Sequence, residues 1–83
     1  MIKFLLFAQL AEEAGRDSLE LEYVAEQSAL AYMSELAQHL PESVMSQLDE
    51  GAVMLSINQQ IATWEEKLAD GDVIGLLPPF SGG

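Results

Sequence analysis

The first apolar segment is an almost unbroken run over residues 2–8, rich in the branched and aromatic side chains that favour strands. A run of this kind predicts a central strand that is covered on both faces. Successive residues of a strand point to opposite sides. One side therefore carries Ile2, Phe4 and Leu6, and the other carries Lys3, Leu5 and Phe7.

A second strand is predicted over residues 18–24, where apolar and acidic side chains alternate. Leu19, Leu21 and Tyr23 share its apolar face, and the glutamates between them face water. We expect it to pair with the first strand as a hairpin-like unit. Residues 9–14, which connect the two strands, have a short helical character, and Gly15 is their stop signal.

The main helix is predicted between Ser28, a candidate N-cap, and Pro41, which ends it. Apolar residues recur at helical spacing within it, at Leu30, Met33, Leu36, Ala37 and Leu40. Residues 41–50 are expected to form a short turn or a single helical turn closed by Gly51. Its inward side chains are Val44, Met45 and Leu48.

Three further strands complete the pattern. The third has Val53, Leu55 and Ile57 on one face. A tight turn at Asn58-Gln59 leads into a short strand over residues 60–64. Asp70-Gly71 is a strong turn signal before the last strand, residues 73–77. Pro78-Pro79 ends the ladder, because proline has no N–H to donate.

This order predicts an α+β fold with a mixed five-strand sheet and one main helix on one face. The second face of the sheet is then left with exposed apolar residues, which is typical of a partner surface. If Lys3 points to solvent, Phe7 lies on this open face. In the alternative, loops cover that face and Phe7 is part of the core.

The charge of the chain narrows its range of partners. Its 83 residues form one domain with a net charge of −11, and its cations are Lys3, Arg16 and Lys67. Nucleic acids and anionic membranes would be repelled, whereas a basic protein surface is complementary. The acidity is also explained if it serves solubility alone. The apolar stretch at the N-terminus is too short for a signal peptide, so we expect a cytoplasmic protein.

No group of side chains in the sequence predicts catalysis. The chain has no cysteine, which excludes disulfides, thiolate metal sites and a cysteine nucleophile. Its one histidine, His39, lies near a predicted helix end, where it would interact with the helix dipole. The acidic pairs are adjacent in sequence and are interpreted as solvated charge. We therefore expect no catalytic residue, no metal site and no bound cofactor.

The C-terminal residues are the strongest functional candidate. Two prolines stiffen the exit from the last strand, Phe80 offers an anchor, and Ser81-Gly82-Gly83 ends in a free carboxylate. The last six residues extend to about 20 Å, and glycine lets a backbone enter a narrow channel. We divide the chain into a domain, residues 1–77, and an extended flexible tail, residues 78–83. A frayed terminus without function is the alternative.

Four stretches together resemble the small-subunit family of molybdopterin synthase, in order over nearly the whole chain. They are Phe7-Ala8-Gln9 with Gly15, Ile57-Asn58-Gln59, Leu68-Ala69-Asp70-Gly71-Asp72 and Leu77-Pro78-Pro79-Phe80-Ser81-Gly82-Gly83. The ending is the most specific of them. The resemblance implies the β-grasp fold of ubiquitin and the role of a sulfur carrier.

The resemblance also implies how the carrier works. An E1-like adenylyltransferase uses ATP to adenylate Gly83, whose carboxylate then becomes a thiocarboxylate. The tail, Phe80 to Gly83, enters the active site of the large subunit and gives sulfur to cyclic pyranopterin monophosphate. Two small and two large subunits form a heterotetramer, and the catalytic groups lie on the large one. By position, the apolar contact residues are Phe7, Ile61 and Leu77.

The sequence departs from the family pattern in two places and leaves alternatives open. Ala11-Glu12 stands where many relatives have Arg-Glu, and Val73 stands where many have an acidic residue. Neither position is in the tail. Other functions compatible with the ending are a sulfur carrier for thiamine thiazole or another pathway, and a ubiquitin-like modifier that attaches to lysines. A plain acidic binding module is a third class.

Overall fold

The structure is a computed structural model that describes residues 1–78. Its elements follow in the order β1 (Ile2–Leu6), α1 (Gln9–Ala14), β2 (Ser18–Leu21), the 3₁₀ turn η1 (Ala29–Tyr32), α2 (Met33–His39), α3 (Glu42–Asp49), β3 (Met54–Ile57), β4 (Gln60–Ala62) and β5 (Val73–Leu77). The first and last strands coincide closely with those predicted from the sequence.

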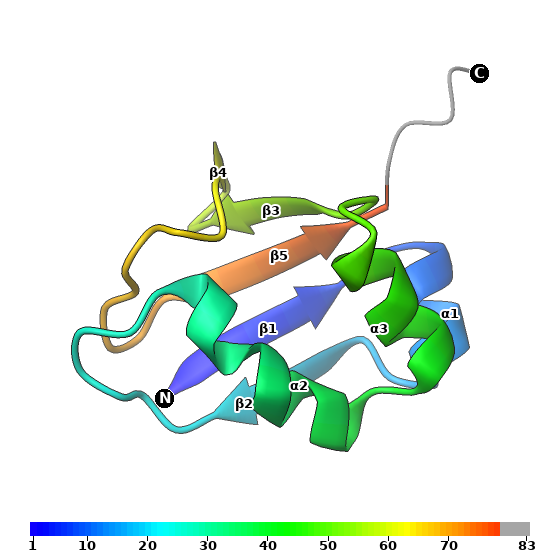
Figure 1. The fold of residues 1–83 in the computed structure, drawn as a ribbon, viewed down its shortest axis with the longest axis horizontal. Helices are drawn as coiled ribbons and strands as arrows, with labels where there is room; N and C mark the ends of the chain where they lie inside the picture. Colours follow the sequence, from blue (N-terminus) through cyan, green and yellow to red (C-terminus); the bar gives the residue numbers. More distant parts are fainter. Residues whose placement is uncertain (79–83) are drawn as a thin grey trace.

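The strands form one five-stranded sheet in the order β2-β1-β5-β3-β4 (Figure 1). The central pair, β1 and β5, runs parallel. Every other neighbouring pair is antiparallel, including the predicted pairing of β1 with β2. The predicted α+β class with a mixed five-strand sheet is therefore confirmed.

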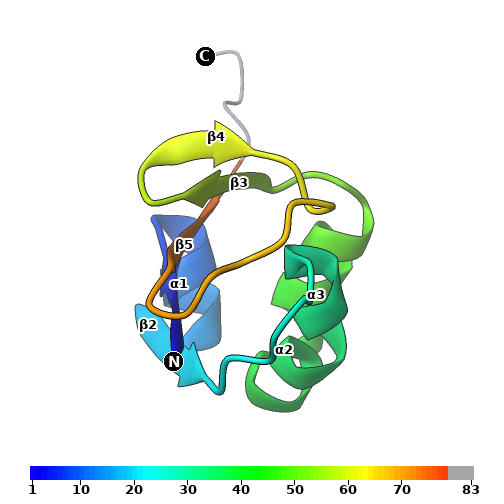
Figure 2. The ribbon, with the colours of Figure 1, turned by 90° about the vertical axis from the view of Figure 1, so that its left-hand side faces the viewer.

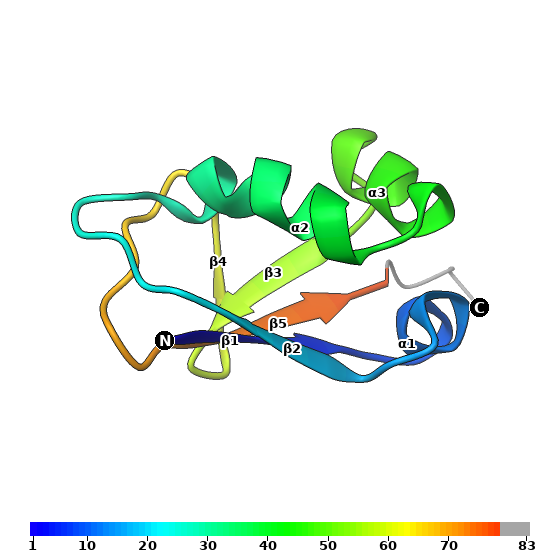
Figure 3. The same cartoon turned by 90° about the horizontal axis from the view of Figure 1, so that it is seen from below.

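Helices α2 and α3 lie together on one side of the sheet, whereas α1 lies at its end (Figures 2 and 3). The core fills the space between this helical layer and the sheet. From β1 it receives Ile2, Phe4 and Leu6, and from β5 it receives Ile74 and Leu76. The prediction that β1 is covered on both faces is wrong, because Lys3 and Phe7 on its other side are exposed. The helices reach one face of the sheet only.

The helical layer differs from the prediction in its phase and in its extent. Ala29 and Tyr32 are buried, and Leu30, which was expected inside, is 51% exposed. The first turn, η1, is a 3₁₀ helix with three residues per turn. A prediction based on the 3.6-residue period of an α-helix therefore assigns the wrong residues of this turn to the core. The segment expected to be at most one helical turn is the eight-residue α3. Its predicted inward residues are buried, namely Val44, Met45 and Leu48.

A network of hydrogen bonds joins the β3–β4 turn to the start of β5. Asn58 and Gln59 both have positive φ, as a two-residue hairpin requires. The Asn58 amide donates to Asp72 at 2.9 Å, and its oxygen accepts from the Val73 N–H at 3.0 Å. Asp72 also accepts from the Ala69 N–H at 2.8 Å. The predicted turns at Asn58-Gln59 and Asp70-Gly71 are thus confirmed and held together.

Across residues 1–78, none of the helices has the length and apolar character needed to cross a bilayer. β5 ends at Leu77. The proposed boundary between a domain and a tail at residue 78 stays a prediction.

Candidate functional site on the open face of the sheet

Strand register places two of the predicted contact residues, Phe7 and Leu77, side by side on one face of the sheet. Phe7 follows Leu6, which pairs with Leu76, so Phe7 lies beside Leu77 at the end of β5. Leu77 pairs in turn with Met54 of β3. Directly paired residues point to the same side of a sheet, so these three side chains form one row. The row faces away from the helices, because the neighbouring Leu6 and Leu76 face the core.

The next row runs across four strands through Leu5, Gly75, Ser56 and Ile61. Ile61 is 67% exposed and Phe7 is 42% exposed, whereas Leu77 is half-buried. Large apolar side chains gathered on one face mark an interaction surface. We call the two rows together the open face. The structure thus brings Phe7, Ile61 and Leu77 onto one surface, and their contact with a partner stays a prediction.

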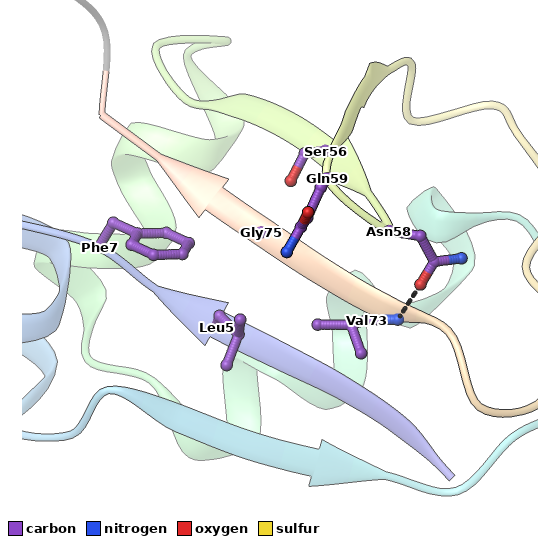
Figure 4. A pocket seen from close by; sticks show the side chains of 7 residues that line it. All are labelled: Leu5, Phe7, Ser56, Asn58, Gln59, Val73 and Gly75. Atoms are coloured by element: carbon purple, nitrogen blue, oxygen red, sulfur yellow. Dashed lines mark hydrogen bonds between the residues drawn. The ribbon is translucent and has the colours of Figure 1, made fainter.

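Gly75 sets the position of the Phe7 ring. A Cβ atom on Gly75 would lie 3.3 Å from the Cε2 atom of Phe7 and would collide with the Oγ atom of Ser56. The ring and the serine hydroxyl therefore occupy space that only glycine leaves free. Figure 4 shows Phe7 and Ser56 on either side of Gly75. A glycine inside a strand signals such a close approach, but the sequence alone did not identify Gly75 or Ser56 as part of the site.

The backbone directly after Phe7 is strained. Ala8 has φ 53° and ψ −130°, a conformation that L residues rarely adopt. Its carbonyl accepts hydrogen bonds from the N–H groups of Ala11 and Glu12, and the Phe7 carbonyl accepts one from Leu10. The start of α1 thus holds Ala8 in this conformation. Strain of this kind costs about 1–3 kcal/mol and gathers at functional sites.

We expect Ala8→Gly to raise the free energy of unfolding by about 1 kcal/mol, because glycine adopts this backbone conformation without a clash. Urea denaturation of the two proteins measures the change. A loss of about 1 kcal/mol, the usual cost of glycine within a helix, would contradict the assignment of strain to Ala8.

The open face contains a hollow of about 290 Å³. Its lining residues are Leu5, Phe7, Ser56, Asn58, Gln59, Val73 and Gly75 (Figure 4). The apolar side chains come from β1, from Phe7 directly after it and from β5, and the polar ones come from β3 and its turn. The hollow therefore has apolar walls and one polar end.

The tail begins beside this face. β5 ends at Leu77, next to Phe7, and the half-buried Pro78 is the last residue described. The residues predicted to enter a partner, Phe80, Ser81, Gly82 and Gly83, lie outside the described residues. What the structure adds is the place from which they start, at the edge of the open face.

The other candidates from the sequence form no site on this surface, although Glu66 lines a hollow together with Ile61. His39 is exposed in the last turn of α2, the position expected for a contact with the helix C-terminus. The predicted acidic pairs, Glu12-Glu13, Asp49-Glu50 and Glu65-Glu66, are all exposed. Within the described part of the chain, no three or more His, Asp or Glu side chains come together in a way that would hold a metal ion.

Comparison with known proteins finds a family and relatives that span the chain. Residues 4–83 match the ThiS family. The molybdopterin synthase sulfur carrier subunit of Haemophilus influenzae is 34% identical over 83 residues, which cover all of both chains. The crystal structure of SAMP1 from Haloferax volcanii is 26% identical, with 99% of this chain and 98% of that chain covered and a TM-score of 0.75.

A third structure resembles the fold at lower identity. It is the protein–protein complex of subunits 1 and 2 of the molybdopterin-converting factor from Helicobacter pylori 26695. The identity is 23%, the covered shares are 99% of this chain and 97% of that chain, and the TM-score is 0.65. These superpositions confirm the predicted ubiquitin-like β-grasp fold.

Proposed function

Because this chain belongs to the ThiS family, we propose that it is the sulfur carrier subunit of a molybdopterin synthase. The observation that carries the proposal is 34% identity, over its full length, to a protein of that name. The family match also runs through Gly83, so it includes the Gly-Gly ending. The open face and the tail that starts beside it supply a docking surface and a carrier group.

The proposed chemistry takes place at the C-terminal carboxylate of Gly83. An ionised carboxylate is a poor electrophile, so it must be activated first. In an E1-like enzyme, a carboxylate oxygen attacks the α-phosphorus of ATP and pyrophosphate leaves. A hydrosulfide ion, delivered by the sulfur source, then attacks the acyl carbon of the adenylate; AMP leaves, and loss of the S–H proton gives the thiocarboxylate. This chain contributes no acid, base or metal to these steps.

The proposed partner is the large subunit of the synthase, with two small and two large subunits in the complex. In Helicobacter pylori, subunits 1 and 2 of the molybdopterin-converting factor form a complex, which supports a partner of this kind. Phe7, Ile61 and Leu77 are the proposed contacts. The net charge of −11 favours a basic surface around them.

The proposed acceptor of the sulfur is cyclic pyranopterin monophosphate, which becomes a dithiolene on receiving two sulfur atoms. The rivals are a carrier for thiamine thiazole or another sulfur pathway, and a protein modifier. A sulfur carrier gives its sulfur to an acceptor enzyme, whereas a modifier is itself attached to a protein. The two sulfur pathways differ in the acceptor enzyme, so a comparison of the large subunit with the thiazole synthase of the same organism distinguishes them.

Reconstitution tests the proposal. The carrier, its activating enzyme, ATP and a sulfur source are combined with the large subunit and cyclic pyranopterin monophosphate. We expect two thiocarboxylates to be consumed for each dithiolene formed, and no sulfur transfer when the thiazole synthase replaces the large subunit. Thiazole formation without dithiolene formation would contradict the proposal, as would lysine conjugates of the carrier in cells.

A further inference from the structure

The hollow beside Phe7 has room for a single side chain. Its volume is about 290 Å³, at the lower end of the range of small-molecule sites, about 300–1,000 Å³. The side chains of Leu5, Phe7 and Val73 surround the backbone of Gly75 (Figure 4). An apolar side chain placed there would be covered by apolar groups on several sides.

Two amide side chains, Asn58 and Gln59, lie at the polar end of the hollow, and the first of them is already hydrogen-bonded. Asn58 uses its amide nitrogen for Asp72 and its amide oxygen for the Val73 N–H. These bonds hold the turn, so they are not free for a polar ligand. The Ser56 hydroxyl points toward Gly75 rather than away from it. The Gln59 amide extends toward Gly75 (Figure 4), and the rest of the accessible lining is mainly apolar.

The hollow lies within reach of whatever protein holds the tail. Gly75 precedes Leu77 by two residues, which is about 7 Å along a strand. The six residues from Pro78 to Gly83 span about 20 Å at most. A protein that encloses Gly83 therefore lies within about 20 Å of the end of β5, which is close enough for its surface to cover the adjoining hollow.

A second copy of this chain is a poor occupant. Two copies would each have a net charge of −11, and their mutual repulsion opposes association. A partner with an apolar projection surrounded by basic residues would complement both the negative charge of this chain and the apolar lining of the hollow. The open face and the hollow are also continuous, because Phe7 belongs to both.

We propose that the hollow over Gly75 is the socket for one large apolar side chain, aliphatic or aromatic, from the large-subunit partner. This inference rests on the proposed function. Interfaces draw most of their binding energy from a few such anchors that fill well-packed pockets. Gly75 and Ser56 shape the socket, and Val73 supplies the wall opposite Phe7.

Filling the socket tests the proposal. Ser56→Leu places an apolar side chain over Gly75 from the neighbouring strand, where a cross-strand side chain packs favourably on a glycine. We expect its melting temperature to equal or exceed that of the wild type, and its affinity for the large subunit to fall at least about tenfold. Isothermal titration calorimetry measures the affinity. Ser43→Leu, on the exposed surface of α3, makes the same change on the helical side and should leave binding unchanged.

A second measurement does not depend on the stability of the filled variant. The chain has no cysteine, so Ser56→Cys and Ser43→Cys each introduce a single thiol. We expect the large subunit to slow alkylation of the thiol at position 56 by at least about tenfold, as burial in an interface core requires. The thiol at position 43 should react at its original rate.

The outcomes separate the inference from the proposed function. Failure of the wild-type carrier to bind the large subunit would overturn both. Two results would overturn the socket and leave the carrier function intact, provided that the wild-type carrier binds the large subunit. One is an unchanged affinity of Ser56→Leu, and the other is an alkylation rate at position 56 that the large subunit does not slow. Loss of affinity in Ser43→Leu as large as that in Ser56→Leu would also overturn the socket.

Discussion

Deletion of Gly82 and Gly83 is expected to abolish sulfur transfer completely and to leave the melting temperature at its wild-type value. The two residues follow the end of β5, and the hydrophobic core within the described residues 1–78 lies between Ile2 and Leu76. The deletion removes the carboxylate to which the sulfur would be attached and shortens the reach of the tail by about 7 Å. Thermal denaturation and single-turnover sulfur transfer measure the two effects separately.

A matched control lengthens the tail by one residue and blocks its chemistry. One alanine added after Gly83 preserves both glycines and the reach of the tail, but the terminal carboxylate then belongs to alanine. We expect this variant to bind the large subunit and to transfer no sulfur. Sulfur transfer by the deleted chain would contradict the account. A large fall in its melting temperature would show that the tail is part of the folded domain.

Phe7→Asp is expected to weaken binding of the large subunit by about 100-fold, because it replaces a central aromatic contact with a charge that the interface would have to desolvate. Stability should change little, because Phe7 is 42% exposed and lies on the open face, away from the core. Calorimetric titration and urea denaturation give the affinity and the free energy of unfolding.

The control for Phe7→Asp is Val24→Asp. Val24 is 47% exposed and lies by the helical layer, beside Tyr32 and Glu35. The same acidic group is thus introduced at similar exposure but away from the open face. We expect it to leave binding unchanged. Unfolding of Phe7→Asp would place Phe7 in the core, and equal loss of affinity in both variants would show that net charge alone governs binding.

The open face was predictable from the alternation of the first strand. Lys3 is charged and must reach water, and Phe7 lies an even number of residues away, so both had to share the exposed side. Strand alternation is a local property, and the structure confirms it. The placement of Ile61 and Leu77 beside Phe7 required the strand order and register, which the resemblance to the small-subunit family implied.

The errors arose where tertiary structure determined local conformation. Leu30 fits an α-helical stripe, but a 3₁₀ turn changes which residues face inward, and Ala29 is buried in its place. Gly75 gave a visible signal as a glycine within a strand, yet its role depends on Phe7, which follows β1, and on Ser56 of β3. No local pattern contains that arrangement. The tail was identified from its composition, and its residues 79–83 lie outside the described part of the chain.

The most direct test of the central claim is the intact mass of the purified chain after incubation with ATP, its activating enzyme and a sulfur source. Conversion of the Gly83 carboxylate to a thiocarboxylate replaces one oxygen by sulfur, so we expect a gain of about 16 Da that fragmentation assigns to the C-terminal residue. The gain should be absent when ATP is omitted. An unchanged mass, under conditions that load a known sulfur carrier with its own activating enzyme, would contradict the account.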